Sequence, residues 1–336
     1  MLIIYFSCGK IPFVILIFEV VMANTVKKSK SFVASLLLVL AAFIWGSTFL
    51  AQKEGLSQIG NFTFLALRSY LAVVVLTPVS LFIYKNNKKK YGDGDHGENK
   101  SFFSKRLFVG GVLCGASVCI ASLMQQYGMV FSEQNSTVSR AGFLTTLYIL
   151  MVPLIGLIFR KKVKPILWFC IAIATVGMYF LCVTESGSIG LGDLFLIICA
   201  LLFAIQIMIV DHFVKTLDGV RLSLIQFGVA AIISTVGMFV FEKPDLMAIK
   251  DAWFSIFYAG VLSSGVAFTL QVVAQKNLNP TVASLIMSLE SVFAALTGAV
   301  FGERLTSNEI LGCTLVFLAI ILAQLPVENL FKKKKT

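Results

Sequence analysis

Charged residues are scarce in this sequence. Aspartate, glutamate, lysine and arginine make up only 13% of the 336 residues, whereas 58% are hydrophobic and the mean hydropathy is +0.90. A soluble domain has about 25% charged and about 45–50% apolar residues, because polar groups must cover its surface. This composition excludes a soluble globular protein and predicts that lipid surrounds most of the chain.

Ligand groups for metals and phosphates are also few. The sequence has only two histidines, His96 and His212, and its seven cysteines lie in apolar stretches without a CxxC pair. Cysteine in such surroundings behaves as a small hydrophobic residue, so neither a zinc site nor a disulfide framework is expected. No phosphate-binding loop and no pairing of a nucleophile with a base occurs. We therefore expect no metal, no cofactor, no catalytic residues and no enzymatic activity.

Acidic residues are outnumbered by basic ones, which gives a net charge of +11. The basic residues gather in short clusters between long apolar runs, at 27–30, 85–90, 160–164 and 332–335. Clusters of this kind flank membrane spans on the cytoplasmic side and attract anionic lipid head groups. Their placement favours a lipid bilayer as the partner and argues against nucleic acid.

Ten apolar runs are long enough to cross a bilayer as helices, which takes about 20 residues. The runs are 31–51, 61–84, 106–131, 136–159, 164–183, 190–212, 220–241, 252–274, 281–301 and 307–326. The longest polar connection, 85–105, is too short and too polar to fold alone. The sequence therefore predicts an all-α polytopic membrane protein with ten transmembrane helices and no sizeable soluble domain.

The segment 1–30 precedes the first run and is interpreted as a leader. Its apolar part, 11–21, is interrupted by Pro12 and Glu19 and lacks a cleavage site of small residues. Met22 begins MANTVKKSK, a usual cytoplasmic start for a membrane protein. We interpret Met22 as the start of the product; the alternative is an eleventh hydrophobic segment on or in the membrane.

The basic residues are divided unequally between the two sides of the predicted membrane. If the segment before the first run is cytoplasmic, 21 lysines and arginines fall inside and four fall outside. Because cytoplasmic loops carry the excess of positive charge, both termini are predicted to be cytoplasmic, including a basic tail at 327–336. A multi-pass protein of the cell membrane is expected, and the lysine-rich tail without long appendages favours a bacterial inner membrane.

The two halves of the chain resemble each other. The segment from Asn135, NSTVSRAGFLTTLYILMVPLIGLIFRKKVKP, aligns with NPTVASLIMSLESVFAALTGAVFGERLTS from Asn279 after a shift of about two residues. Each half, 31–183 and 190–326, holds five runs. Because five is an odd number, the second half begins on the opposite side of the membrane and is inverted relative to the first. The turn RKKVK would lie inside, whereas its counterpart GERLT would lie outside and has lost the lysines. Inverted repeats are typical of secondary transporters, with the substrate site near mid-membrane.

Four motifs resemble the drug/metabolite transporter superfamily, in its EamA-type branch. They are AAFIWGSTF at 41–49, TFLALRSYLA at 63–72, SRAGFLTTLY at 139–148 and SLESVFAALTGAVFGERLT at 288–306. The resemblance extends from Met22 to the C-terminus and implies two inverted five-helix repeats, a central cavity and alternating access. Relatives move amino acids, metabolites, nucleotide sugars or drugs. The Glu-Pro pair that the family often has in the ninth span is Glu290-Ser291 here, which puts a proline kink in doubt.

Ionisable side chains inside the spans are candidates for function, because insertion of one costs roughly 2.5–3.5 kcal/mol. Glu290, near the middle of the ninth run, is expected to contact a substrate ammonium or to carry a coupling proton; the alternative is a structural ion pair with Arg68 or Arg140. Arg140 can bind a substrate carboxylate with its two-pronged guanidinium, but its place near a span end equally suits a structural role. Arg68, in the second run, is interpreted as slightly more structural than functional.

Uncharged polar residues in the runs form a second group of candidates. Trp45 and Tyr148 lie within the family-like motifs and are predicted to form a wall or gate of the cavity. Gln126 and Gln271 carry amides that need hydrogen-bond partners, so each either lines the cavity or joins two helices. Two pairs of glycines with GxxxG spacing predict close helix packing in the third and ninth runs: Gly111 with Gly115, and Gly298 with Gly302.

These observations predict a secondary transporter, a permease or exporter that moves a small metabolite, such as an amino acid or a drug-like compound, across the cytoplasmic membrane by alternating access. One alternative is a non-transporting membrane scaffold or sensor. Another is an intramembrane enzyme, which would need a converging acid–base or metal set. The sequence leaves open the substrate, the direction of transport, the coupling ion and whether the chain forms a homodimer.

Overall fold

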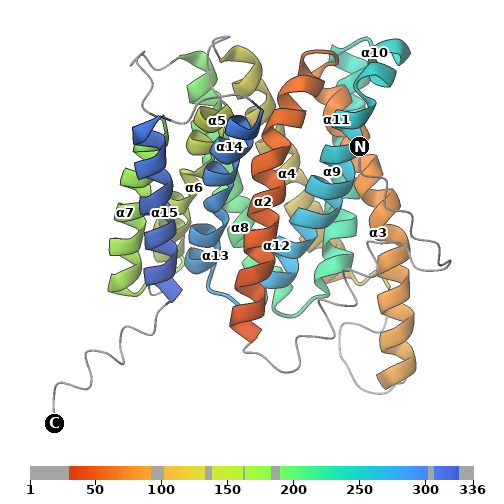
Figure 1. Ribbon diagram of the computed structural model, residues 1–336. Coiled ribbons are helices and arrows are strands. Elements are labelled where there is room, and N and C mark those ends of the chain that lie inside the picture. The colour runs from red at the N-terminus through yellow and green to blue at the C-terminus, as the bar shows by residue number, and fades with distance from the viewer. Residues whose placement is uncertain are drawn as a thin grey trace, which may run out of the picture.

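A computed structural model describes residues 30–91, 102–132, 138–161, 163–182, 190–301 and 306–324. Within these ranges every regular element is a helix, and the helices stand side by side in one bundle (Figure 1). The predicted leader up to residue 29, the basic tail and Gly302 lie outside the described residues. Helices suit a bilayer because each satisfies its backbone hydrogen bonds within its own segment.

The first half of the chain supplies six helices. They are α2 (Lys30–Leu56), α3 (Asn61–Tyr91), α4 (Lys105–Phe131), α5 (Val138–Thr146), α6 (Tyr148–Ile158) and α7 (Pro165–Cys182). The second half supplies α8 (Leu191–Val214), α9 (Gly219–Phe241), α10 (Leu246–Asp251), α11 (Trp253–Phe257), the π-helix η3 (Tyr258–Ala267), α12 (Phe268–Gln275), α13 (Pro280–Met287), α14 (Leu289–Val300) and α15 (Ser307–Gln324).

Each of the ten apolar runs is helical where the structure describes it. In the described residues, eight helical stretches are long and apolar enough to cross a membrane by length and composition. Two further apolar helices, at Pro165–Phe180 and Ile310–Ala323, are shorter. The structure therefore supports a multi-pass membrane protein, and the count of ten spans stays a prediction.

Two of the runs are interrupted near their middle without a proline at the break. Leu147 separates α5 from α6, and Ser288 separates α13 from α14. At both breaks the backbone bonds to a residue three positions away: the Leu150 N–H donates to the Leu147 carbonyl over 3.0 Å, and the Ser291 N–H to the Ser288 carbonyl over 3.2 Å. Such bonds tighten a helix turn, so the ninth run is interrupted although it lacks the Glu-Pro pair.

The eighth run contains a long π-helical segment. η3 lies between α11 and α12 and packs against α2 and α3. Its Gly260 allows close approach, because a Cβ atom there would lie 2.7 Å from Leu71 Cβ and 3.0 Å from the Arg68 carbonyl oxygen. π-Helical turns within α-helices frequently occur at functional sites.

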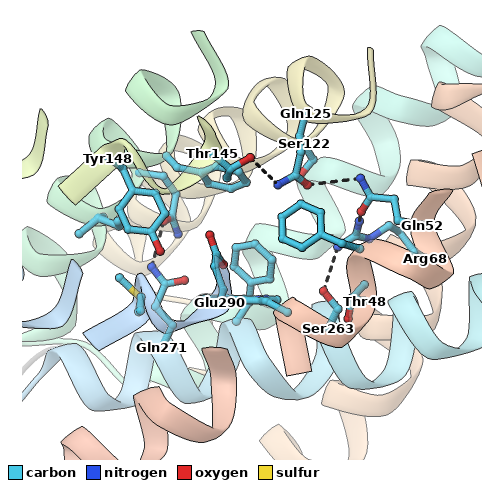
Figure 2. Close-up of a pocket in the computed structure, with 17 residues that line it drawn as sticks. Thr48, Gln52, Arg68, Ser122, Gln125, Thr145, Tyr148, Ser263, Gln271 and Glu290 are labelled. Carbon is cyan, nitrogen blue, oxygen red and sulfur yellow. Dashed lines mark hydrogen bonds between the residues drawn. The ribbon is translucent and has the colours of Figure 1, made fainter. Parts of the chain in front are cut away.

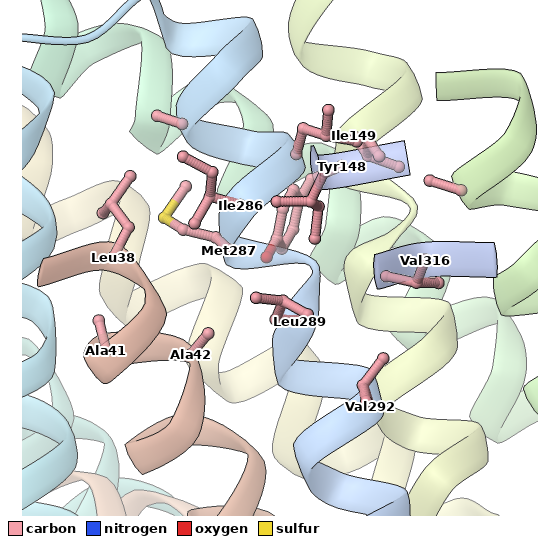
Figure 3. Packing of buried hydrophobic residues seen from close by; sticks show 14 of the residues in the cluster. Leu38, Ala41, Ala42, Tyr148, Ile149, Ile286, Met287, Leu289, Val292 and Val316 are labelled. Atoms are coloured by element: carbon pink, nitrogen blue, oxygen red, sulfur yellow. The ribbon is translucent and has the colours of Figure 1, made fainter. Parts of the chain in front are cut away.

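Apolar side chains fill the space between helices from both halves of the chain. Leu38 and Ala42 of α2 lie near Met287 and Leu289 at the break between α13 and α14, as Figure 3 shows. Val316 of α15 belongs to the same buried cluster. Large hydrophobic side chains also cover much of the outer surface, as expected for a protein whose surroundings are lipid.

Basic residues lie mainly at one end of the bundle, called here the basic side, which is the lower end in Figure 1. α2 begins and α15 ends on this side (Figure 1). The described basic residues at or near helix ends of the basic side are Lys30, Lys85, Lys105, Arg106, Arg160, Lys161, Lys164, Lys215, Arg221 and Lys276. The other side has Lys53, Lys243 and Lys250 among its described residues.

Candidate functional site

A partly open cavity lies between helices of the two halves; about 520 Å³ of space in the cavity and at its mouth is not occupied by atoms. Arg68 and Glu290 both line it, and Figure 2 shows them toward different ends of it. The other lining residues are Trp45, Thr48, Phe49, Gln52, Ser122, Gln125, Thr145, Tyr148, Phe203, Gln206, Ile207, Ser263, Phe268, Gln271 and Met287. Five of the seven predicted substrate or coupling residues therefore meet at one cavity: Arg68, Glu290, Trp45, Tyr148 and Gln271.

Arg68 is 3% exposed and is held by neutral side chains from two other helices. Its Nε donates to Ser264 Oγ over 2.9 Å and its Nη2 to Ser263 Oγ over 3.2 Å. Its Nη1 donates to Gln52 Oε1 over 3.1 Å. The two serines are neighbours on η3. Because Arg68 forms no ion pair within the part of the chain that the structure describes, its positive charge is not neutralised by a neighbouring carboxylate.

A chain of amides continues from Arg68 across the cavity wall. Gln52 Nε2 donates to Gln125 Oε1 over 3.3 Å, and Gln125 Nε2 donates to Thr145 Oγ1 over 3.4 Å (Figure 2). These bonds connect α2, α4 and α5. The guanidinium is therefore fixed in place by hydrogen bonds, which is how a buried cation is kept ready for an anionic group.

Glu290 lies in the first turn of α14 and is 4% exposed. Its Oε1 has no hydrogen-bond partner, and the hydroxyl of the nearby Tyr148 also completes no hydrogen bond. Tyr148 directly follows the break at Leu147 and Glu290 is the second residue after the break at Ser288, so the interrupted helices bring the two side chains together at the cavity (Figure 2). The expected ion pair between Glu290 and Arg68 or Arg140 is not among the contacts of the described residues.

Aromatic rings form the apolar wall of the cavity. The Trp45 and Phe268 ring centroids are 4.9 Å apart, and those of Phe203 and Phe268 are 6.3 Å apart. Trp45 Nε1 is buried and has no hydrogen-bond partner. Trp45 thus packs with two phenylalanines, while Tyr148 stands beside Glu290; a role of Trp45 and Tyr148 as wall or gate stays a prediction.

Arg140 and Gln126 are not on the cavity wall. Arg140 binds the carboxylate of Asp193, with Nη2 and Oδ2 2.6 Å apart, and so joins α5 to α8. Gln126 is fully buried in α4, and its side-chain oxygen and nitrogen both lack a partner. Its neighbour Gln125 lines the cavity instead.

The glycines of the third run contact α9 closely. A Cβ atom on Gly111 would lie 2.4 Å from Ile225 Cγ2, and one on Gly115 would lie 2.6 Å from the Gln226 carbonyl oxygen. Gly298 is buried in α14. These contacts set the distance between α4, which supplies Ser122 and Gln125 to the cavity, and α9.

Several cavity residues were not among the predicted ones. Serine and threonine commonly pack between membrane helices. Residue type alone therefore does not identify Ser263 as a partner of Arg68, or Thr145 as a partner of Gln125. Two adjacent serines within a glycine-containing run, GVLSSG, were the available signal. Asp193 and Asp211 sit at ends of the sixth run and were overlooked as ion-pair partners.

The cavity is lined by a carboxyl group and a guanidinium that form no ion pair with each other among the described residues, together with polar and aromatic side chains. Pockets that bind small molecules usually combine apolar walls with a few polar groups of this kind. Within the described ranges, no three histidine, cysteine, aspartate or glutamate side chains lie together as a metal site.

The model of the EamA-like transporter family matches residues 32–183 and again residues 190–325. An uncharacterized transporter of Archaeoglobus fulgidus is 28% identical over 307 residues, covering 89% of this chain and 88% of that protein. The uncharacterized transporter YoaV of Bacillus subtilis is 24% identical over 291 residues, covering 85% of this chain and 94% of that protein.

A protein of known crystal structure has the same fold, with a TM-score of 0.68 over 88% of this chain and 98% of its own length at 16% identity. The family model covers most of the chain in two copies, one in each half. The chain therefore belongs to the EamA-like transporter family and is a multi-pass membrane transporter.

Proposed function

We propose that this protein is a secondary transporter that moves a small zwitterionic metabolite, of the amino-acid class, by alternating access. Its spans would be ten, arranged as two inverted five-helix repeats at 31–183 and 190–326. Both termini would face the cytoplasm, and the membrane would be the cytoplasmic membrane of a bacterium. The cavity, which is lined by a carboxyl group and a guanidinium that do not pair with each other, is the observation that carries the proposal.

The packing of the helices supports an inverted repeat. In the first half, α2 packs against η3, α12 and α14 of the second half; correspondingly, α8, which begins the second half, packs against α4, α5 and α6 of the first. In the remaining two pairs, each helix packs against its own counterpart in the other half: α3 packs against α9, and α7 packs against α15. This reciprocal pattern is expected when two similar halves are related by a two-fold axis in the membrane plane.

The chemistry of the cavity favours a substrate with both charges. A carboxyl with an unpaired oxygen suits an ammonium group, and the Tyr148 hydroxyl beside it can accept a further hydrogen bond. Arg68 uses three of the five N–H groups of its guanidinium on its described neighbours, which leaves donors for a substrate carboxylate. A zwitterion placed between them would bring its ammonium to the Glu290 carboxyl and its carboxylate to the Arg68 guanidinium, and so would give each group a partner of suitable chemistry.

The aromatic wall would receive the apolar part of the substrate. Trp45 and Phe268 line the same cavity as Arg68 and Glu290, and the Trp45 N–H is available for a hydrogen bond. Alternating access would require the helices around the cavity to open on one side at a time.

The proposal is tested with purified protein reconstituted into liposomes. Uptake of labelled L-amino acids is measured in pools, without ATP, and each pool is also tested for its effect on the unfolding temperature. A substrate that binds the native state raises that temperature by mass action. Because a hydrogen bond to a charged group contributes about 1.5–3 kcal/mol, Glu290→Gln and Arg68→Gln are each expected to weaken binding roughly 10- to 100-fold.

The matched control is Glu54→Gln, which removes a carboxylate at an exposed position near the end of α2. It should leave binding and uptake unchanged. If folded protein transports no pool and none shifts its unfolding temperature, the zwitterion proposal is wrong and the scaffold or sensor alternative is favoured. If a transported pool is unaffected by Glu290→Gln, then Glu290 is structural.

A further inference from the structure

Four buried glutamines lie between the cavity and the basic side. They are Gln206 of α8, Gln226 of α9, and Gln271 and Gln275 of α12, each no more than 2% exposed. We call them the inner glutamine cluster. Gln206 and Gln271 line the cavity, whereas Gln275 is the last residue of α12 and is followed by the exposed Lys276. The cluster therefore reaches from the cavity toward the basic side.

Hydrogen bonds link the four amides into one chain. Gln271 Nε2 donates to Gln206 Oε1 over 3.1 Å and to Gln275 Oε1 over 3.3 Å. Gln206 Nε2 donates to Gln226 Oε1 over 3.3 Å. Gln275 Nε2 donates to the Ile207 carbonyl over 3.2 Å. Three helices of the second half are thus joined by uncharged groups that can each donate and accept.

Two polar atoms of this chain of amides make no hydrogen bond. Gln271 Oε1 and Gln226 Nε2 are buried and have no partner. A buried amide without its hydrogen bond costs free energy, so four amides that served only to join helices would be expected to satisfy one another. One acceptor and one donor remain, which are the groups that an ammonium and a carboxylate of a passing molecule require.

The cluster corresponds in position to the network around Arg68. Arg68 is the eighth residue of α3, counted from Asn61, and Gln226 is the eighth residue of α9, counted from Gly219. α3 starts on the side opposite to the basic side, whereas α9 starts on the basic side (Figure 1). The two networks therefore lie on opposite sides of the cavity, one charged and one neutral.

We propose that the inner glutamine cluster is a second substrate subsite, which holds the ammonium and carboxylate groups by hydrogen bonds when the cavity opens to the basic side. This inference rests on the proposed function, because it needs a transported zwitterion. Lacking a charge, the cluster holds a carboxylate less tightly than Arg68 does, since hydrogen bonds to a charged donor are about twice as strong. Because it is bound weakly at the cluster, the substrate is not trapped there and can be released or received on the basic side.

The test uses single cysteines in full-length protein. Gln226→Cys and Gln275→Cys are made separately, and a small membrane-impermeant thiol reagent is supplied from the basic side in inside-out vesicles. The unchanged protein contains seven cysteines, so its labelling is subtracted from the labelling of each variant. The control is Gln126→Cys, also fully buried but away from the cavity. Two positions are tested so that one misfolded variant does not end the experiment.

We expect both cluster cysteines to be labelled, and the control to remain unlabelled. A pool of L-amino acids that the protein transports, at about ten times its Kd, should slow the labelling roughly tenfold by mass action. Transport without labelling would show that the cluster stays closed and only joins helices. Labelling that a transported pool does not slow would show a water path rather than a subsite. If no pool is transported, the proposed function itself fails, so the two failures are distinguishable.

Discussion

Arg140 binds Asp193 through two parallel hydrogen bonds, from Nε to Oδ1 over 3.0 Å and from Nη2 to Oδ2 over 2.6 Å. Asp193 also accepts from the Gly190 N–H over 2.9 Å and so orders the start of α8. The pair joins α5 to α8 at the ends opposite to the basic side. An arginine whose guanidinium makes two hydrogen bonds to a carboxylate on another helix primarily joins the two helices, whatever else it contacts.

Removal of this pair should lower stability. Asp193→Asn leaves the partly buried guanidinium without its counter-charge, and the expected loss is about 3 kcal/mol, the low end for a broken buried pair. Arg140→Lys keeps the charge but not the two-pronged geometry and should cost less. Thermal unfolding of the two variants in detergent measures the difference. If Asp193→Asn unfolds like the unchanged protein while substrate binding is lost, Arg140 binds substrate instead.

A second connection joins the same pair of spans on the basic side. Lys161, which follows α6, pairs with Asp211 near the end of α8, and Lys215 reaches the same carboxylate over 3.2 Å. Asp211 is fully buried, and its Oδ1 has no partner. Together with Arg140 and Asp193, this cluster fastens the fourth and sixth runs at both ends, so we expect them to move as one body.

The two lysines should not contribute equally. The Lys215 side chain is 55% exposed and that of Lys161 is 34% exposed, so Lys161→Ala should lower the unfolding temperature more than Lys215→Ala. Loss of both leaves an uncompensated buried carboxylate and should cost about 3–5 kcal/mol. Adding Asp211→Ala to the double variant should restore part of that stability, because it removes the buried charge. A triple variant less stable than the double one would contradict this explanation.

The sequence predicted where the helices lie because length and hydropathy are local properties of the chain. It did not predict the breaks at Leu147 and Ser288, since no proline or glycine stands at either position. It also did not predict η3, whose residues are ordinary for a membrane helix. These irregularities depend on packing between helices that are distant in sequence, and they are what places Tyr148, Glu290 and Ser263 at the cavity.

The candidate site was predicted in part. Glu290 and Arg68 were identifiable because an ionisable group within an apolar run is costly and therefore noticeable. The choice of Gln126 over Gln125 could not be corrected from sequence, because adjacent residues of a helix point about 100° apart and both faces of a membrane helix are apolar. Asp193, the partner of Arg140, lies 53 positions away along the chain.

The carboxylate of Glu242 caps the start of α3 from the end of α9. It accepts from the N–H groups of Phe62 and Thr63, each over 2.8 Å, and from the Thr63 hydroxyl over 2.6 Å. Glu242→Gln keeps the shape but removes the charge that favours a helix N-terminus, so a loss of about 1 kcal/mol is expected. Hydrogen exchange should accelerate at the amides of Phe62 and Thr63. Unchanged exchange there would show that the cap does not hold α3.

A close contact between α2 and α14 involves Gly46 of α2. A Cβ atom at this position would lie 2.5 Å from Phe293 Cβ, 2.7 Å from the Glu290 carbonyl oxygen and 2.8 Å from the Ala294 nitrogen. Two of these atoms belong to the backbone of α14, which cannot rotate away as a side chain can. Gly46→Ala must therefore displace α14, and with it Glu290, at a cost of about 1–3 kcal/mol.

Gly228 of α9 provides the matched control, because a Cβ atom there would meet no heavy atom within 4 Å. Gly228→Ala should be neutral or should stabilise the protein by up to about 1 kcal/mol, since alanine favours the helix over glycine. Thermal unfolding and substrate binding are measured for both variants. We expect Gly46→Ala to lower both quantities and Gly228→Ala to lower neither. Equal behaviour of the two would mean that α2 and α14 are not packed as closely as the structure has them, and that the position of Glu290 does not depend on Gly46.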